Sequence, residues 1–597
     1  ALAPVTTLEH QYLVTEPLDA LETDQTLFPL VRDPDIRFYL RRERSSFLLG
    51  SYAHEGRPAW PEGPPDSFAH QLFPDSLDDM ADVLEGTIAH LPLLAEAGIQ
   101  RAVNGPIAYA PDALPLVGPA AGLPNFYHAT GVQIGITHSA AIGKAMVEWI
   151  TEGETEWDLS AWDPRRFGRW ADNDYAQSRA SEHYGLQYAI PFPHRIMRSG
   201  RPVNRTPLYE TLKARGAVFG QIGGWERAFW SARDGKPCPK PDDGYGHLSF
   251  RDDEPWREAV RAECEAVRDA VGVMDHGGFT KFEVEGPGAA GFLDKVFCGR
   301  LPSVGRIKLS YMLTPKGRLW SEATIARLAD DRFLLCGPTL AVDRDHDWLR
   351  AHLPNDGSVD LRQGSAFDGA LMVMGPKSRE LLSALTEADL SANAQPWMSV
   401  HEMEIAGVPV IVLRVSYVGE LGWELHVRSA DLEKLYAAIA KAGAPLGLRD
   451  FGSYALNVMR IEKGYHAWGA DFGTEYTPFD AGLERFVASE KPAFIGRDAV
   501  IAMQDRTPDW RFLGFEIDSL DADALPSDPI TKDGEVIGYV TSAAFGYRTK
   551  KRLALGYVRN GSGTLGDRFD IEILGRPCQA IGTSPHAYDP SNLRLKS

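Results

Sequence analysis

The sequence predicts a multidomain α+β protein that ends in a small β-barrel. Its 597 residues are too many for a single hydrophobic core, so several domains are expected. Helical and strand periodicities alternate without a fixed repeat through the middle of the chain, whereas the last part alternates with period two between glycine turns. We therefore expect four parts, at residues 1–150, 151–205, 206–492 and 493–597.

The first part is expected to combine short strands with two helices. Apolar residues at helical spacing over 76–91 predict an amphipathic helix, and a second helix ends near Ile150. The latter contains Lys144 and Glu148, which favours a buried helix of a water-soluble domain over a membrane span. Strands are expected in aromatic and branched runs at 11–15, 38–40 and 46–50, and at 125–130 before a tight turn.

The later parts supply the remaining elements. Residues 151–205 are rich in Trp, Arg, Asp, Tyr and Pro and weakly periodic, which indicates a segment that crosses the surface between domains. Further strands are expected at 281–284, 333–336, 371–374, 408–415 and 423–427. Helices are expected at 256–271, 289–296, 378–385, 429–442 and 451–462. The barrel strands are expected at 512–517, 536–541, 553–558 and 569–574.

Composition excludes several classes of function. Lys+Arg 62 against Asp+Glu 82 gives a net charge of −20, which repels phosphate backbones, so no nucleic-acid partner is expected. The five cysteines are scattered and never form a CxxC pair, which fits a reducing compartment and no structural metal. No long apolar run and no signal peptide are found, so we expect a cytoplasmic protein without a membrane partner.

Gly561–Gly566 matches the dinucleotide-binding pattern G-x-G-x-x-G. That pattern binds a pyrophosphate only between a strand and a helix, whose N-terminus then faces the phosphates. Here an alternating strand follows at 569–574, so an ordinary hairpin loop is the better interpretation.

A second glycine-containing turn, at 130–139, joins a strand to a helix. Gly131 and Gly135 let the backbone approach a ligand, and the first N–H groups of the helix, near Ile136, Thr137 and His138, are free to donate. This would suit the electron-rich edge of a reduced flavin. Many ordinary strand-to-helix turns have the same appearance, so both readings stay open.

Two further groups of residues have a functional and a structural reading. His10 and Tyr39, on expected neighbouring strands, could bind a carboxylate or exchange a proton, or be a surface histidine and a core tyrosine. Around the bend at 416–425, Tyr417, Glu420 and Glu424 could hold a pterin or guanine ring through paired hydrogen bonds. The alternative there is a bulged strand with solvated acids.

In this order the motifs resemble the dimethylglycine dehydrogenase/dimethylglycine oxidase family, over essentially the whole chain. The second half is also similar to the T-protein of the glycine cleavage system, a tetrahydrofolate-dependent aminomethyltransferase. Besides residues 10–15 and 416–425, the resemblance is carried by runs at 104–107, 111–119, 224–227, 312–318, 460–465, 467–469 and 538–542.

This resemblance implies an enzyme with two sites. At the first, FAD removes hydride from an N-methyl group of a methylated amino acid and leaves an iminium. At the second, tetrahydrofolate captures the one-carbon unit as 5,10-methylenetetrahydrofolate, which keeps formaldehyde from forming. An amine-oxidoreductase remnant of the substrate or cap side, an aminomethyltransferase-type folate domain and a C-terminal β-barrel would then follow one another along the chain.

The resemblance also suggests roles for single residues. His10 and Tyr39 match the family's substrate-site pair, and the run from Gly135 to His138 matches the turn under the flavin ring. Tyr417 and Glu424 match pterin-binding positions.

Two more positions are carried over to the folate half. Arg460 would pair with the glutamate tail of folate. Glu322 stands where T-protein relatives have a catalytic Asp, one methylene longer, as in the dimethylglycine dehydrogenase branch, and this favours that branch over sarcosine dehydrogenase.

The front of the chain departs from the family. No glycine-rich Rossmann segment is found at or after Ala1, so we expect the FAD-cradling part to be absent and the FAD site incomplete. The chain would then be a fragment, rely on a flavin-domain partner chain, or have lost flavin activity. A folate-only aminomethyltransferase and a non-catalytic subunit are the rival functions, and an electron-transfer flavoprotein is a further partner in the leading reading.

Overall fold

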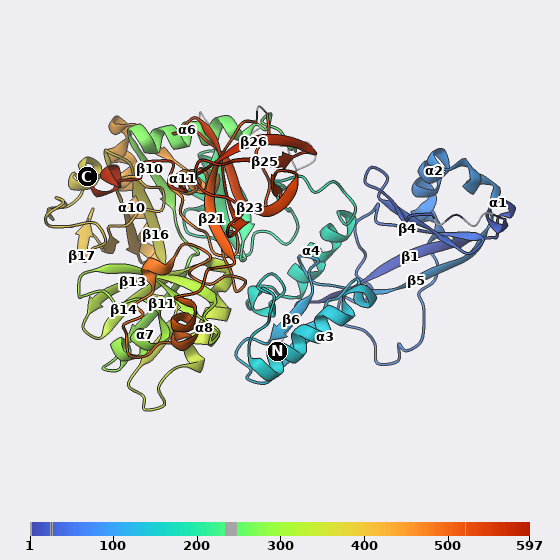
Figure 1. Ribbon diagram of the computed structural model, residues 1–597, viewed down its shortest axis with the longest axis horizontal. Coiled ribbons are helices and arrows are strands. Elements are labelled where there is room, and N and C mark those ends of the chain that lie inside the picture. The colour runs from blue at the N-terminus through green and yellow to red at the C-terminus, as the bar shows by residue number, and fades with distance from the viewer. Residues whose placement is uncertain (1–2, 24–25, 27, 233–247, 520) are drawn as a thin grey trace. The chain divides into compact units, whose positions relative to one another are not determined.

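The chain divides into two compact units (Figure 1). The first comprises Ala1–Thr155 and Ala161–Arg201, and the second comprises Glu156–Ser160 and Pro202–Ser597. Cys238, one of the five cysteines, lies outside the described residues. The computed structural model describes residues 3–23, 26, 28–232, 248–519 and 521–597.

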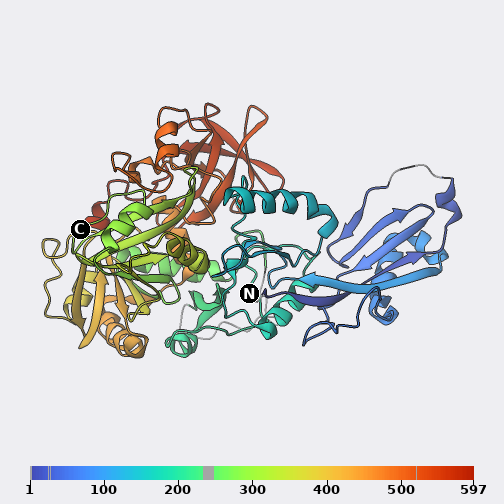
Figure 2. The same cartoon turned by 90° about the horizontal axis from the view of Figure 1, so that it is seen from below.

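The first unit is built on an antiparallel five-stranded sheet in the order β2-β3-β4-β1-β5, seen from two directions in Figures 1 and 2. The three strands predicted here are confirmed as β1, β3 and β4, whereas β2 and β5 were not predicted. Most side chains of β5 are exposed or half-buried, so it lacks a clear alternation. The strands are β1 (Thr6–Thr15), β2 (Val31–Asp33), β3 (Phe38–Glu43), β4 (Ser46–Ser51) and β5 (Ile99–Tyr109).

One face of this sheet carries an apolar core. Because side chains alternate along a strand, Leu13, Phe38 and Leu49 share the face that packs against Val83 of α2. The predicted amphipathic helix is thereby confirmed, with a 3-10 turn before it. The elements on this side are α1 (Asp19–Glu22), η1 (Leu77–Met80), α2 (Ala81–His90) and η2 (Pro92–Glu96).

The opposite face packs against α4 (Asn173–Gly185), which lies inside the segment predicted to be a surface connection. The Asp172 carboxylate caps this helix by accepting from the Tyr175 N–H at 2.8 Å. Ala180 and Tyr184 are fully buried in the cluster under the sheet. The prediction of a purely connecting segment is wrong at this helix, because α4 completes the core of the first unit.

The strand–turn–helix predicted around residue 131 is confirmed. A two-stranded sheet of β6 (Leu116–Pro119) and β7 (Tyr127–Thr130) leads into α3 (Gly135–Glu152), and η3 (Pro164–Arg166) follows. The prediction that this helix is buried is wrong, because its N-terminal Ile136 is 96% exposed and few of its side chains are buried. None of the helices in the described ranges has both the length and the apolarity needed to cross a membrane.

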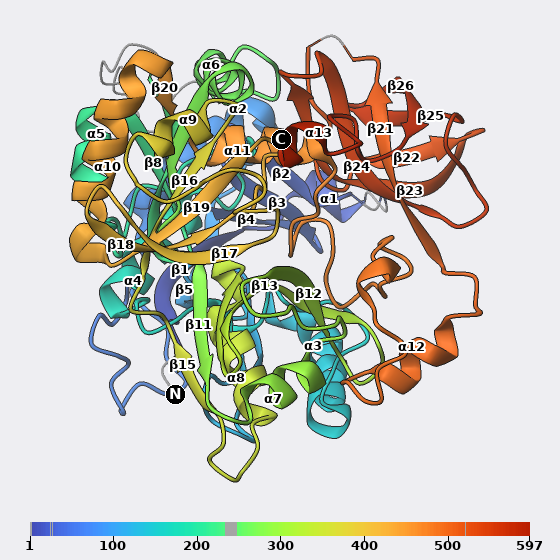
Figure 3. The same ribbon diagram turned by 90° about the vertical axis from the view of Figure 1, so that its left-hand side faces the viewer.

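The second unit contains a six-stranded sheet, β17-β18-β19-β16-β10-β20, in which only the β10–β20 pair is parallel. All predicted strands and helices of this region are present. Figure 3 shows this sheet, a five-stranded sheet and a barrel as three groups of strands. The six strands are β10 (Val271–Asp275), β16 (Gly369–Met374), β17 (Val400–Ile405), β18 (Val408–Leu413), β19 (Gly422–Val427) and β20 (Leu448–Asp450).

The five-stranded sheet has the order β12-β13-β14-β11-β15, and a separate hairpin is formed by β8 and β9. Their bounds are β8 (Ala217–Ile222), β9 (Trp225–Ser231), β11 (Thr280–Glu285), β12 (Ile307–Leu313), β13 (Leu319–Ala329), β14 (Arg332–Gly337) and β15 (Asp360–Gln363). The helices and 3-10 turns of this unit are α5 (Tyr209–Ala214), α6 (Trp256–Asp269), α7 (Ala289–Val296), η4 (Thr339–Ala341), α8 (Val342–Ala351), α9 (Ser378–Ser383), α10 (Ser429–Gly443), η5 (Ala444–Leu446), α11 (Ser453–Lys463), η6 (Glu484–Phe486), α12 (Arg497–Met503) and α13 (Leu593–Lys596).

The C-terminal barrel is confirmed and is closed in the order β21-β24-β23-β22-β25-β26. The motif Gly561–Gly566 joins β24 to β25, two strands that do not pair with each other. It is therefore a strand-to-strand loop, as predicted, although not a hairpin. The strands are β21 (Trp510–Ile517), β22 (Pro529–Lys532), β23 (Glu535–Gly546), β24 (Lys551–Arg559), β25 (Arg568–Ile573) and β26 (Arg576–Thr583).

Candidate active sites

The first candidate site is centred on His10 of β1, in the first unit. Its Nε2 lies 3.0 Å from the Tyr39 hydroxyl and its Nδ1 lies 2.9 Å from the Tyr184 hydroxyl. Tyr39 reaches His10 because its ring lies over Gly50, its partner on β4, where any Cβ would overlap the ring. The structure thus brings the predicted pair together and adds a third member from α4.

The surroundings of this site keep its groups uncharged. Burial, with a smaller effect of His54, lowers the pKa of His10 to about 4. Burial also raises the pKa values of Tyr39 and Tyr184 above their usual range. The ring of Tyr52 stacks on His10 at 4.7 Å between centroids. At neutral pH the site is therefore a neutral imidazole held between two phenols.

The turn predicted to lie under a flavin forms the start of α3. Gly131 has φ of +68°, and no side chain of the described residues caps the helix, so the N–H groups near Ile136 and Thr137 lack a side-chain partner there. The His138 N–H, predicted to be free, instead donates to the Ile134 carbonyl at 3.1 Å. A Cβ on Gly135 would meet nothing within 4 Å. His138 Nδ1 is buried without a hydrogen-bond partner in the described structure. An open helix start and an unpaired polar atom fit the polar edge of a flavin, whereas the exposed Ile136 side chain points to solvent.

The second candidate site, in the second unit, contains the predicted Glu322 of β13. Burial, reinforced by the negative charge of Asp471, raises the pKa of Glu322 from 4.5 to about 8, although a Trp468 N–H and the Arg460 charge oppose the shift. Glu322 is therefore a neutral acid near pH 7, able to give up a proton there.

Arg460 is held within the protein. It forms an ion pair with Asp471, and its Nη2 donates to the Ser542 hydroxyl at 2.7 Å. Its Nε donates to the Asn457 side chain at 2.9 Å, and the residue is 3% exposed. The carboxylate of Asp471 also accepts from the hydroxyls of Thr541 and Ser542, at 2.6 and 2.7 Å. These contacts hold Arg460 in place inside the protein and do not favour the predicted direct contact with a folate tail.

Tyr417 lies beside this charged pair. Its hydroxyl donates to the His466 carbonyl at 2.7 Å and its ring stacks on Tyr465. Burial raises its pKa, a shift that Arg460 opposes and Glu322 reinforces. Three predicted residues, Tyr417, Glu322 and Arg460, therefore lie in one electrostatic neighbourhood.

Glu424 faces a second buried group of residues. Burial raises its pKa, while its electrostatic interactions with His276 and Lys281 oppose the rise. His426 Nε2 lies 3.4 Å from its Oε2, and the Nδ1 atoms of His276 and His426 are buried without partners in the described structure. A carboxylate with so few hydrogen bonds beside unpaired ring nitrogens fits an incoming polar heterocycle, as a pterin would be. Among the described residues, no hydrogen bond joins Glu424 to Tyr417.

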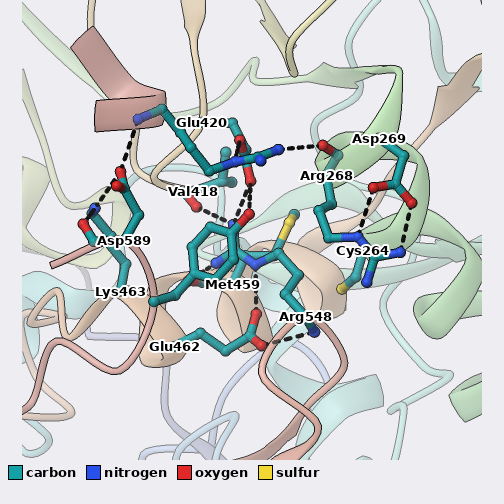
Figure 4. A network of polar contacts seen from close by, with 12 residues as sticks. Cys264, Arg268, Asp269, Val418, Glu420, Met459, Glu462, Lys463, Arg548 and Asp589 are labelled. Carbon is teal, nitrogen blue, oxygen red and sulfur yellow. Dashed lines mark hydrogen bonds and ion pairs between the residues drawn. The ribbon is translucent and has the colours of Figure 1, made fainter. Parts of the chain in front are cut away.

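Glu420, grouped with these two by its position in the bend, has a different surrounding (Figure 4). Its carboxylate accepts from the Tyr588 hydroxyl at 2.6 Å and from Arg594 Nε at 2.7 Å, and it forms an ion pair with Arg548. These internal partners favour a structural role for Glu420. The alternative of a solvated acid is wrong at this position, because the residue is 1% exposed. The bend itself is real, since Gly419 has φ of +80°.

Tyr184 and Asp471 are among the residues of these sites that the sequence did not reveal. Tyr184 lies in the segment that was interpreted as a connection. The sequence did hold a signal for a helix there, because Asp172 is a favourable N-cap residue before Tyr175 and Ala176. Asp471 follows the recognised run 467–469 by two residues, but a lone Asp carries no pattern of its own.

Family models match four consecutive parts of the chain. Residues 1–149 match the FAD dependent oxidoreductase, and 152–206 match its central domain. Residues 208–491 match the GCVT N-terminal domain, and 511–589 match the glycine cleavage T-protein C-terminal barrel domain. The expectation that the FAD part is absent is thereby corrected, because residues 1–149 belong to it. These modules support FAD and tetrahydrofolate as cofactors.

Known proteins agree with these assignments. A crystal structure of glycine cleavage system aminomethyltransferase T from Bartonella henselae has the same fold over 65% of this chain and 98% of its own, with a TM-score of 0.55 and 22% identity. The chain is 31% identical to human mitochondrial sarcosine dehydrogenase, over 99% of the chain and 68% of that protein. It is 35% identical to mitochondrial dimethylglycine dehydrogenase of Mus musculus, over 99% of the chain and 68% of that protein. A flavin oxidoreductase part, a T-protein part and this level of identity place the chain in the dimethylglycine dehydrogenase family.

Proposed function

We propose that this enzyme removes a methyl group oxidatively from N,N-dimethylglycine, or a related N-methyl amino acid, and passes the one-carbon unit to tetrahydrofolate. The observation that carries the proposal is the pairing, in one chain, of an uncharged His10–Tyr39 site in a flavin module with a protonated Glu322 in a T-protein module. The product would be 5,10-methylenetetrahydrofolate.

In the flavin half, His10 and Tyr39 would receive the amino acid. FAD, when bound, supplies the hydride acceptor, and the turn from Gly131 through Gly135, Thr137 and His138 would face its ring. A neutral imidazole and a phenol can bind the substrate carboxylate or amine through hydrogen bonds without adding a buried charge. The resulting iminium hydrolyses to formaldehyde in water, so a shielded path to folate preserves the carbon.

In the folate half, Glu322 would move protons. Its neutral carboxyl group can give a proton to the departing amine, and the carboxylate that remains can take up the proton lost by folate N10. Glu424 would hold the pterin ring and Tyr417 would flank it. Arg460 would hold Asp471 in place through their ion pair.

Sarcosine is the second candidate substrate, favoured by the 31% identity to human sarcosine dehydrogenase. A folate-only aminomethyltransferase is the second candidate activity, since the T-protein models cover 208–491 and 511–589. We propose a cytoplasmic enzyme, with the mitochondrial matrix as the alternative, since the mouse relative is named as a mitochondrial protein. An electron-transfer flavoprotein is the proposed protein partner.

The test supplies the purified protein with FAD, tetrahydrofolate and either dimethylglycine or sarcosine. Flavin absorbance reports cofactor binding, and the ratio of 5,10-methylenetetrahydrofolate to formaldehyde reports carbon transfer. We expect Glu322→Gln to oxidise the amine normally but to release formaldehyde, and His10→Ala to lose oxidation while keeping its folate affinity. Equal damage to both readouts in both variants would contradict two separate sites, and a colourless protein that still binds folate would favour the folate-only activity.

A further inference from the structure

The two tyrosine hydroxyls that contact His10 differ in the other acceptors available to them. The Tyr184 hydroxyl has two neighbours, His10 Nδ1 at 2.9 Å and the Ser51 carbonyl at 3.4 Å. The Tyr39 hydroxyl, in contrast, has His10 Nε2 as its hydrogen-bond partner in the part of the chain that the structure describes. A carbonyl only accepts, and a neutral imidazole has one donor and one acceptor nitrogen.

The two tautomers of His10 differ in the number of hydrogen bonds that they allow. With the proton on Nδ1, His10 donates to Tyr184, Tyr184 donates to Ser51, and Tyr39 donates to Nε2, so three hydrogen bonds form. With the proton on Nε2, His10 donates to Tyr39 and Tyr184 donates to Nδ1. The Tyr39 proton is then left without an acceptor among the described residues, and only two hydrogen bonds form.

We propose that Tyr184 is a positioning residue that holds His10 in the Nδ1–H tautomer, so that the Nε2 lone pair receives the Tyr39 hydroxyl proton. The inference rests on the proposed function for the role of His10 and Tyr39. It adds the residue that sets the direction of the hydrogen bond between them. Tyr184 lies on α4, within the range 152–206 that matches the central domain of the oxidoreductase.

The side chain of Tyr184 is held in one position by its surroundings. It is 1% exposed, and Gly56 lies so close that a Cβ there would come within 2.9 Å of the Tyr184 Cβ. The His54 ring stacks on it at 5.5 Å and the Tyr52 ring lies at 4.7 Å. The charged groups that act on it, Arg57 and Asp79, form an ion pair with each other, so they exert little net field.

Fixing the tautomer has a chemical consequence. The Tyr39 oxygen keeps its lone pairs free for a substrate, while its proton already points at Nε2. A substrate N–H can then donate to the Tyr39 oxygen while the Tyr39 proton stays hydrogen-bonded to His10 Nε2. The uncharged pair thereby orients the substrate amine beside the flavin without taking a proton from it.

The first test reads the tautomer directly and needs no turnover. Protein labelled with ¹⁵N-histidine is studied by long-range ¹H–¹⁵N correlation NMR, with His10→Gln used to assign the His10 signals. We expect Nδ1 to be protonated and Nε2 unprotonated in the wild type. An Nε2–H tautomer in the wild type would overturn the proposal, whatever the variants do.

The matched variants are Tyr184→Phe and Tyr109→Phe. Both remove one buried hydroxyl from the same aromatic cluster, but Tyr109 donates to Gln187 and has no hydrogen bond to His10. Loss of one hydrogen bond should shift the His10 tautomer ratio about tenfold toward Nε2–H in Tyr184→Phe, with no shift in Tyr109→Phe. Equal shifts in both would indicate a general packing effect and contradict the proposal.

The second test uses the flavin-loaded enzyme. We expect Tyr184→Phe to lower kcat for amine oxidation by roughly tenfold or more with a displaced pH profile, and to leave KM nearly unchanged. If the wild type shows the Nδ1–H tautomer but oxidises no methylated amino acid, the proposed function fails while the positioning stands. If oxidation proceeds and Tyr184→Phe leaves its rate and pH profile unchanged, the positioning role fails alone.

Discussion

Arg548 of the barrel loop donates from Nε to Glu462 Oε2 of α11 at 2.6 Å, and neither side chain is exposed to solvent. Glu462 also accepts from the backbone N–H groups of Arg548 and Thr549 at 2.9 and 2.8 Å. Arg548 in turn donates to the carbonyls of Val418 and Met459 (Figure 4). One buried ion pair therefore ties the barrel to the helix and to the bend before β19.

Removing one partner of this pair should be costly, because it leaves a buried charge without compensation. We expect Glu462→Gln to destabilise the second unit by about 3–5 kcal/mol, measured from the urea midpoint of its unfolding. The exposed pair Arg332–Glu402 offers the control, and Glu402→Gln should leave the midpoint where it is. Equal shifts in both variants would mean that burial of the pair is unimportant.

The raised pKa of Glu322 should appear as a pH dependence of stability. The folded state binds the proton more tightly than the unfolded chain, whose carboxyl titrates near 4.5, so this contribution is complete below that pH and is lost as pH rises through about 8. Glu322→Gln carries no titrating proton there. Between pH 5 and 8, the thermal midpoint of the wild type should therefore fall relative to that of Glu322→Gln, and parallel curves would contradict the raised pKa.

Gly50 should be required for the position of Tyr39. A Cβ there would overlap the Tyr39 ring, so Gly50→Ala must move the hydroxyl away from His10. We expect amine oxidation to fall about 100-fold, within the range of a lost acid–base group, without a change in folate affinity. Gly143 of α3 has open space around it, and Gly143→Ala should leave oxidation unchanged. Normal oxidation in Gly50→Ala would show that Tyr39 need not lie there.

Glu424 should contribute directly to folate affinity. Calorimetric titration of Glu424→Ala with tetrahydrofolate should show binding weaker by about 2–3 kcal/mol, because a charge-assisted contact is removed. Glu404 lies exposed on the edge strand β17, and Glu404→Ala should bind as the wild type does. An unchanged affinity in Glu424→Ala would place the pterin elsewhere.

Much of the fold could be predicted where burial leaves a clear period in the sequence. α7 occupies the predicted residues 289–296, and β16, β19 and β24 are almost wholly buried, so their apolar runs are continuous. β22 was missed because most of its side chains are not buried and no alternation results. β26 was missed because its two buried positions are the small residues Ala580 and Gly582, which give no apolar period in the sequence. α4 was missed because it buries Arg179 and Glu182, which gives it no apolar stripe.

The candidate sites were predictable only in part, because local sequence does not reveal which acid meets which base. Glu420 and Glu424 are four residues apart in one bend, yet the first is saturated by Arg548, Tyr588 and Arg594, which are distant in sequence. The pairing of Arg460 with Asp471 likewise depends on a loop closing back onto α11. The catalytic and ligand-binding roles of His10, Tyr39, Glu322, Tyr417 and Glu424 stay proposals.

The contacts that hold Glu420 also affect the residues on either side of it in the bend. This residue stands between Tyr417 and Glu424, and its oxygens are held by Arg548 from the barrel side and by Arg594 from the C-terminal helix α13. The bend is thus held in place by segments that are far from it in the sequence. Deleting α13 would remove Arg594 from Glu420, so we expect the proposed pterin site at Tyr417 and Glu424 to weaken although both of those side chains are still present.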